Sequence, residues 1–143
     1  MQFIYPATLT PEPTGGFVVT FRDWPEAIAQ GDTRDEALLE AADCLEEAVA
    51  ARIDDRGDIP ASSALLPDEH PVAVPIQTAL KAALYLAVRD MGVGPAELAR
   101  RLGINEKEAR RLIDPRHASK AATLERALRA LGRRLAVEVE KAA

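Results

Sequence analysis

Residues 95–113, PAELARRLGINEKEARRLI, predict how the second half of the chain folds. Pro95 suits the first turn of a helix, and Gly103 is the residue type that most often ends a helix in the left-handed conformation. Asn105 is a typical N-cap for a second helix that continues to Ile113. The spacing therefore predicts two short helices joined by a tight turn, which is the layout of a helix-turn-helix unit.

In this layout, apolar residues close the inside of the helix pair and leave a charged face outside. The inner residues are Leu98, Leu102, Ala109 and Leu112. The outward residues of the second helix would enter the major groove of DNA, and the loop after it would touch phosphates. The predicted DNA-binding residues are Asn105, Lys107, Arg110, Arg111, Arg116, His117 and Lys120. The alternative is a helical bundle with a solvated charged face.

Two glutamates on the second helix oppose tight DNA binding. A carboxylate in the groove repels phosphate unless it accepts a hydrogen bond from a cytosine amino group. Either Glu106 and Glu108 face away from the DNA, or the affinity of one domain is modest and dimerisation supplies the rest.

The first half of the chain is predicted to be a small unit of strands with one helix. Runs of aromatic and β-branched residues are typical of strands, and the prolines and glycines between the first two runs predict a hairpin loop. The strands are predicted at residues 2–9, 16–22, 27–30 and 72–74. Thr33 and Glu36 form a capping-box pattern that predicts a helix to about Ile53. This unit ends near residue 75.

Helices are predicted to make up the remainder. Their expected ranges are 76–91, 96–102, 105–113 and 120–140. The last one carries a stripe of leucines that is either a dimer element or internal core. The fold class is therefore α+β, with one domain at residues 1–75 and a second, all-α domain at residues 76–143.

Charge is divided unevenly between these halves. Residues 1–76 carry 15 acidic and four basic side chains, a net charge of −11, whereas residues 77–143 carry eight acidic and 14 basic, a net charge of +6. Nucleic-acid phosphates attract the second half and are repelled by the first. The asymmetry predicts two different binding tasks.

The composition excludes several protein classes. A single cysteine, Cys44, cannot form an internal disulfide, so a disulfide-stapled secreted scaffold is excluded. No apolar run reaches the roughly 18 residues that a membrane span needs. The first residues lack the basic segment and long apolar stretch of a signal peptide, so we expect a cytoplasmic protein with no membrane partner.

No catalytic, metal-binding or cofactor-binding site is predicted. The first strand supplies no carboxylate for a nuclease site that gathers metal ions. Asp23, Asp32 and Glu36 are accounted for by turns and helix capping. His70 and His117 lie far apart in the sequence, with no ligand spacing around them. We therefore expect neither enzyme activity nor a cofactor.

Both halves of the chain resemble the HicB family of antitoxins. In the first half the resemblance rests on Tyr5-Pro6-Ala7, Gly15 to Phe21, Asp23-Trp24-Pro25, and Gln30 to Thr33 leading into Glu36-Ala37-Leu38. In the second half it rests on Leu98 to Ile104, Arg111-Leu112, Asp114 to His117, and Ser119 to Gly132. Together these stretches span nearly the whole chain, and both halves in this order are more specific than either alone.

The resemblance implies a type II toxin–antitoxin pair. HicB-like antitoxins bind and mask HicA, a small basic messenger-RNA endonuclease that uses a histidine. Their N-terminal domain has a partial RNase H-like fold, and their C-terminal helix-turn-helix domain dimerises and represses the operon. The expected partners are thus a HicA-like toxin, operator DNA and further copies of the chain, as a homodimer or a tetramer. A strongly acidic first half suits a basic toxin.

The chain departs from the family pattern at the turn after the second strand. HicB proteins often read Pro-Gly-Cys there, whereas this chain has Pro25-Glu26-Ala27. Trp24, beside the turn, is either a partner-facing contact or the cap of a small core. The predicted toxin-binding residues are Trp24, Ala27, Ile28, Gln30, Glu40, Asp43 and Glu47. The alternative function is a stand-alone transcriptional regulator that has no toxin partner.

Overall fold

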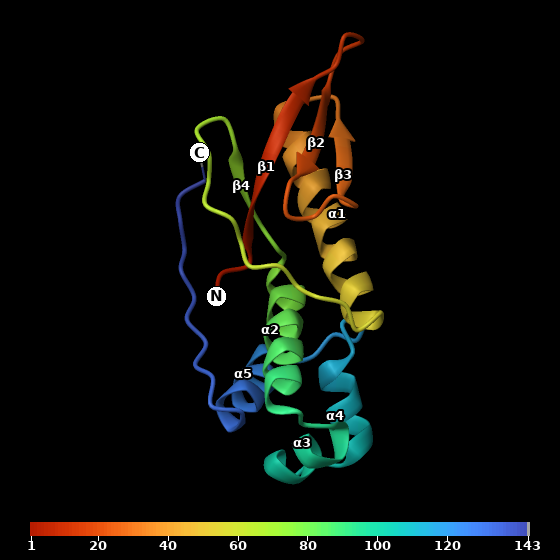
Figure 1. Cartoon of the computed structure of the whole chain (residues 1–143), viewed down its shortest axis with the longest axis vertical. Helices are drawn as coiled ribbons and strands as arrows, with labels where there is room; N and C mark the ends of the chain where they lie inside the picture. The colour runs from red at the N-terminus through yellow and green to blue at the C-terminus, as the bar shows by residue number, and fades with distance from the viewer. Residues whose placement is uncertain (143) are drawn as a thin grey trace.

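The computed structural model describes residues 1–142, an elongated molecule with a sheet at one end and a group of helices at the other (Figure 1). The strands are β1 (Ile4–Pro11), β2 (Phe17–Phe21), β3 (Ile28–Gly31) and β4 (His70–Ala73). The helices are α1 (Arg34–Asp54), α2 (Ile76–Met91), α3 (Pro95–Leu102), α4 (Glu106–Ile113) and α5 (Ala121–Ala130). This order confirms the α+β class, and the strands begin and end within two residues of their predicted bounds.

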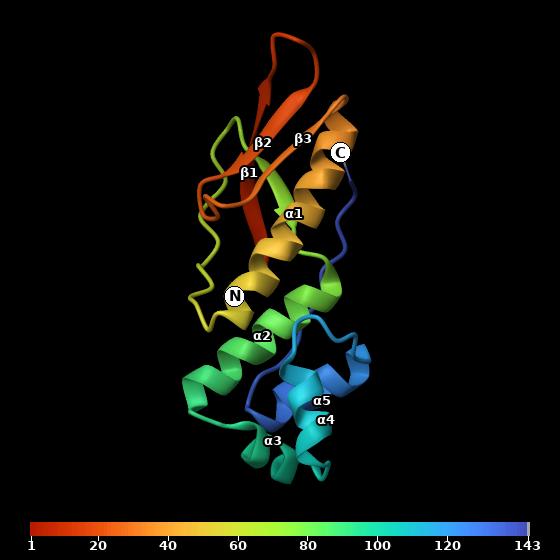
Figure 2. The ribbon, with the colours of Figure 1, turned by 90° about the vertical axis from the view of Figure 1, so that its right-hand side faces the viewer.

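The strands form one antiparallel sheet in the order β3-β2-β1-β4. Alternate residues of the two central strands, such as Tyr5 and Val19, are fully buried because one face of the sheet packs on α1, as strand geometry requires. Figure 2 shows α1 lying along the sheet. At Gly31 the backbone passes so close to α1 that an added Cβ would lie 2.4 Å from the Ala37 nitrogen, so only glycine fits there.

The predicted capping box begins α1. Thr33 Oγ1 accepts a hydrogen bond from the Glu36 backbone N–H at 3.2 Å, and the Glu36 carboxylate accepts one from the Asp32 backbone N–H at 3.2 Å. The first bond satisfies an N–H group that a helix start otherwise leaves unpaired, and the second ties the Glu36 side chain to the residue before the N-cap.

Two hydrophobic clusters fill the molecule, and α2 contributes to both. Ala82 and Tyr85 belong to the cluster under the sheet. Leu84 and Val88, on the other side of α2, belong to a cluster closed by α3, α4 and α5, which includes Leu124. The helix therefore joins the sheet end to the helical end, as Figure 2 shows.

The prediction of a helix over residues 120–140 is wrong beyond residue 130. Gly132 has a φ of +73°, and the Arg133 N–H bonds back to the Leu128 carbonyl at 2.9 Å, which is a typical glycine-terminated helix end. Residues 133–142 continue as extended chain without regular structure. Leu124, Leu128 and Leu131 point into the second cluster, so this part of the leucine stripe is internal core.

Candidate functional site

The α3–α4 pair forms the turn that the sequence predicts. Gly103 has a φ of +67° and follows α3, and Asn105 Oδ1 caps α4 by accepting from the Glu108 N–H at 2.8 Å. Leu98, Ala99 and Leu102 of α3 are buried against Ala109 and Leu112 of α4. The charged side of α4 therefore faces solvent.

Every predicted DNA-binding residue is solvent-exposed. Arg110 forms an ion pair with Glu106 one turn earlier on α4. Within residues 1–142, Lys107, Arg111 and Lys120 form no ion pair and are the free cations of this surface. Glu106 is thus partly neutralised, whereas Glu108 is exposed beside these cations.

A buried lysine that sequence reasoning missed fixes the end of α4. Lys81 of α2 is fully buried, and its ammonium donates to the backbone carbonyls of Arg111 at 2.8 Å and Leu112 at 2.9 Å, and to Ser119 Oγ at 2.7 Å. Burial lowers the pKa of Lys81 to about 8. The one signal in the sequence was a lysine inside the apolar run of α2, between Leu80 and Ala82.

A second contact from α2 holds the loop after α4. The Gln77 side chain accepts from the Ser119 N–H and donates to the Ser119 carbonyl, both at 2.9 Å. Lys81 and Gln77 together position the backbone that carries His117 and Lys120. The side chains predicted to contact phosphates therefore belong to a backbone segment that α2 holds in place.

Arg116 is bound to the C-terminal turns of α1. Its Nε lies 2.7 Å from Asp54 Oδ2 and its Nη2 lies 2.9 Å from Glu47 Oε1, both carboxylates of α1. The hydrogen bonds from Arg116 lower the pKa of Glu47. Arg116, a predicted DNA contact, and Glu47, a predicted toxin contact, are therefore paired with each other. Sequence analysis missed this ion pair because the two residues are 69 positions apart.

The structure corrects the partner-facing interpretation of the turn after β2. Trp24 is fully buried and meets Tyr5 edge to face at 5.5 Å between ring centroids, so it is core. The Arg52 guanidinium lies 4.2 Å above the Trp24 ring. Ala27 is also buried, and neither side chain offers surface to a partner.

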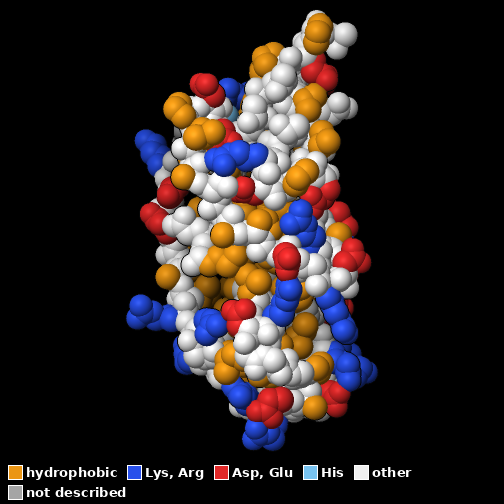
Figure 3. All heavy atoms as spheres, viewed as in Figure 1, with side chains coloured by type: hydrophobic (Ala, Val, Ile, Leu, Met, Phe, Trp, Pro, Cys, Tyr) orange, Lys and Arg blue, Asp and Glu red, His pale blue; other side chains and the backbone are white. Residues whose placement is uncertain are grey.

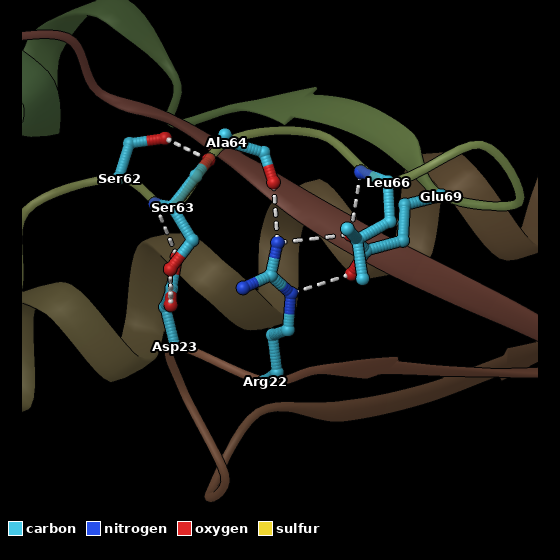
Figure 4. A network of polar contacts seen from close by, with 7 residues as sticks. All are labelled: Arg22, Asp23, Ser62, Ser63, Ala64, Leu66 and Glu69. Carbon is cyan, nitrogen blue, oxygen red and sulfur yellow. Dashed lines mark hydrogen bonds and ion pairs between the residues drawn. The ribbon is translucent and has the colours of Figure 1, made fainter.

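The same turn is fastened to the loop between α1 and β4. Asp23 accepts from the Ser63 N–H at 2.9 Å and from the Ser63 hydroxyl, and Arg22 holds Glu69 with two hydrogen bonds of 2.9 and 3.0 Å (Figure 4). The Arg22 guanidinium also donates to the Ala64 carbonyl. These hydrogen bonds hold the turn after β2 against the loop, so the polar side chains of the turn stabilise the fold.

The remaining predicted toxin-binding residues are exposed. They are Ile28, Gln30, Glu40, Asp43 and Glu47. Gln30 and Glu40 line a hollow of about 560 Å³ between the β1–β2 loop, β3 and the first turns of α1, which we call the acidic hollow. Its four carboxylates are Glu12, Asp32, Glu36 and Glu40. Leu39, which the sequence analysis did not select, is 69% exposed at its edge.

Other kinds of site have no support among residues 1–142. No group of three or more histidine, cysteine or carboxylate side chains is placed to hold a metal ion there. In that part of the chain no helix has the length and apolar character to span a membrane. The candidate surfaces are thus the exposed side of α4 with its following loop, and the acidic hollow.

Comparison with known proteins gives one family. Residues 4–83 match the family described as HicB_like antitoxin of bacterial toxin-antitoxin system. The chain is 40% identical to Antitoxin HicB of Escherichia coli strain K12 over 133 residues, which cover 93% of this chain and 96% of that protein. It is 40% identical to Antitoxin HicB of Pseudomonas fluorescens, with 99% and 97% covered, and 38% identical to Antitoxin HicB 1 of Photorhabdus laumondii, with 95% and 86% covered. The resemblance seen in the sequence is confirmed, and the chain belongs to the HicB-like antitoxins of bacterial toxin–antitoxin systems, which are not enzymes.

Proposed function

We propose that this protein binds and masks a small, basic HicA-like endonuclease toxin and represses its own operon by binding operator DNA. The observation that carries the proposal is the separation of charge within a HicB-family chain, with −11 on residues 1–76 and +6 on residues 77–143. One molecule then has one surface that attracts a basic protein and another that attracts a nucleic acid.

The toxin-binding surface in this proposal centres on the acidic hollow. Four carboxylates converge there beside the exposed side chain of Leu39. A basic protein surface would meet complementary charge around an apolar contact, which is the usual anatomy of a protein interface. The first domain, residues 1–75 with a partial RNase H-like fold, would carry this task.

The DNA-binding surface is the α3–α4 pair as a helix-turn-helix unit within residues 76–143. Lys107 and Arg111 are exposed on α4 and would enter the major groove, and the exposed His117 and Lys120 of the following loop would contact phosphates. Few free cations on one copy favour a homodimer that binds two half-sites.

A co-purification experiment tests the toxin arm. The chain is co-expressed with the product of the neighbouring gene, only this chain is tagged, and growth arrest by the neighbour alone is measured. We expect a small basic protein, toxic on its own, to be recovered with the chain. An inert or unbound neighbour would favour the stand-alone regulator.

Matched variants locate the toxin surface. Leu39→Ala with Glu40→Gln should release the toxin at low salt concentration, because the apolar contact and one charge of the acidic hollow are lost. Neither side chain forms a hydrogen bond within residues 1–142, so the fold should be kept. Asp68→Asn removes one charge at the same end, away from the hollow, and should retain the toxin. Equal retention by both variants would move the toxin surface elsewhere.

Gel-shift titration with the DNA upstream of the operon tests the second arm. We expect binding that weakens steeply with salt concentration. Equal affinity for this DNA and for unrelated DNA would contradict the repressor role and leave the antitoxin role intact.

A further inference from the structure

Lys81 is a cation of the helical end that cannot touch DNA. Exposed Lys and Arg side chains gather at this end of the molecule, as the face drawn in Figure 3 shows, whereas Lys81 is fully buried. Burying an ammonium group is costly unless each of its protons finds an acceptor. A methionine would fill similar space in α2 without this cost, so packing alone does not explain the charge.

The three protons of this ammonium have three acceptors. Two are backbone carbonyls in the last turn of α4, those of Arg111 at 2.8 Å and Leu112 at 2.9 Å, and the third is Ser119 Oγ at 2.7 Å. Carbonyls in the last turn of a helix have no partner within that helix, and a cation there also interacts favourably with the helix dipole. Because α4 has only eight residues, it depends on such contacts from outside.

This arrangement needs the charged form of Lys81. A protonated lysine has three N–H donors, whereas the neutral amine has two and cannot satisfy three acceptors. Loss of the proton therefore leaves either a carbonyl of α4 or the Ser119 hydroxyl without its partner. The end of α4 and the loop that carries His117 and Lys120 are then held less firmly.

The surroundings of Lys81 oppose its charge. Burial lowers the pKa of Lys81 to about 8, and the negative charge of Asp114, at the C-cap of α4, acts weakly in the other direction. The other charged side chains of α4, of the following loop and of α5 are exposed. From α1, Glu47 and Asp54 bind Arg116 of the loop.

We propose that Lys81 is a positioning residue for DNA binding, and that operator DNA holds it in its charged form. The proposal rests on the proposed function, because it concerns the same α4 surface. Contacts with DNA fix α4 and its loop in the arrangement that the three bonds from Lys81 support. The phosphates also add a negative potential in front of a buried cation, which solvent screens weakly. DNA binding therefore takes up a proton, and the affinity falls as pH rises and free Lys81 becomes neutral.

Stability and DNA affinity should respond to pH in opposite directions. Because burial lowers the pKa of Lys81, the unfolded chain binds more protons than the folded chain above about pH 8, and the contribution of Lys81 to stability rises with pH. The DNA-bound chain binds more protons than the free chain, so affinity for DNA falls over the same range. Loss of affinity at high pH is then not loss of the fold.

Titration calorimetry of the wild-type chain with the DNA upstream of the operon, in buffers of different ionisation enthalpy, counts the protons. We expect about half a proton to be taken up per chain near pH 8.5, and the affinity to fall about tenfold from pH 7 to pH 9.5 at constant salt concentration. Binding without proton uptake would overturn the role of Lys81 and leave the repressor function intact. Absence of binding at pH 7 would overturn both.

Lys81→Met assigns the proton to this residue. The variant should bind DNA about tenfold more weakly at pH 7 and should lack the further fall and the proton uptake that the wild type shows. Other titrating groups are present in both proteins and cancel in the difference. Lys107→Met removes an exposed cation of α4 and is the matched control, which should weaken binding by the same factor at every pH. Equal pH profiles of wild type and Lys81→Met would contradict the proposal.

A second pair of variants leaves the buried ammonium in place. Ser119→Ala removes one acceptor and disfavours the charged form of Lys81, so the affinity should begin to fall at a lower pH. Gln77→Met removes the two bonds that hold the Ser119 backbone but none of those from Lys81, so it should weaken binding without moving that pH. An equal displacement in both variants, or in neither, would show that Lys81 has only a structural role.

Discussion

The two ends of the molecule use their charges differently. At the sheet end, Glu12 and Glu40 of the acidic hollow form no ion pair within residues 1–142. At the helical end, many arginines are already bonded to neighbouring glutamates, such as Arg100 to Glu97 and Arg129 to Glu125. Net charge therefore overstates what the basic end offers to a ligand. The net charge sets the long-range attraction of a ligand, whereas direct contacts with the ligand depend on the few cations that form no ion pair within residues 1–142.

The two cores differ as well. Large aromatic side chains fill the sheet end, where Trp24 and Tyr5 are fully buried. Leucines and alanines fill the helical end around one buried ammonium group, that of Lys81. The sheet end should therefore be destabilised most by loss of side-chain volume, and the helical end by changes to the Lys81 ammonium group.

The largest effect is expected from Trp24→Ala. Removing the bulkiest buried side chain leaves a cavity at the sheet end, and we expect a loss of about 3 to 5 kcal/mol in the free energy of unfolding. Urea unfolding followed by circular dichroism measures it. Trp24→Phe should cost much less, because the indole N–H has no hydrogen-bond partner within residues 1–142. Similar losses for both variants would show that ring volume is unimportant.

The next effect concerns Lys81 and pH. Its pKa is lowered from 10.5 to about 8 by burial, so the unfolded chain binds more protons than the folded chain between these values. The contribution of Lys81 to stability therefore rises with pH, by about 2 kcal/mol from pH 8 to pH 10. The measurement is the difference in unfolding free energy between wild type and Lys81→Met at each pH.

That difference also removes other titrations from the result. Burial raises the pKa of Tyr5 to about 12, so its contribution falls only as pH rises above 10, and it is present in both proteins. A difference that stays constant from pH 8 to pH 10 would show that Lys81 keeps an ordinary pKa in the folded chain.

Local patterns predicted most of the fold, and distant contacts account for most of what was missed. Thr33 and Asn105 mark helix starts because capping acts within one turn of the backbone. The end of α5 could have been predicted by the same logic from Gly132, but the stripe of leucines favoured a longer helix. The bond from Arg116 to Glu47 joins separate parts of the chain, and no local pattern encodes it.

A smaller effect is expected from single cations of α4. Arg111→Ala should weaken operator binding about tenfold and reduce its salt dependence, because a free cation is lost. Arg110→Ala should do less, since Arg110 already pairs with Glu106. Gel-shift titrations at several salt concentrations compare them, and toxin retention serves as the control. A larger effect of Arg110→Ala would mean that DNA breaks the helical ion pair.

The smallest effect tests the bond between the two ends. Glu47→Gln with Asp54→Asn frees Arg116 for phosphate, and DNA affinity should rise about two- to fivefold, the range of an exposed ion pair. Asp43→Asn in α1 with Asp55→Asn at its C-cap removes the same amount of charge without releasing Arg116. An equal rise in both would assign the gain to long-range repulsion.

A rise confined to the first variant would make Arg116 a shared residue. A toxin that binds Glu47 would then compete with Arg116 for that carboxylate and release the arginine toward DNA. Linkage requires the reverse as well, so operator DNA bound to Arg116 should tighten toxin binding by the same factor. Measuring toxin affinity with and without operator DNA, in wild type and in Glu47→Gln, decides whether the two ends act separately. Equal toxin affinity with and without DNA would leave the ion pair a purely structural contact.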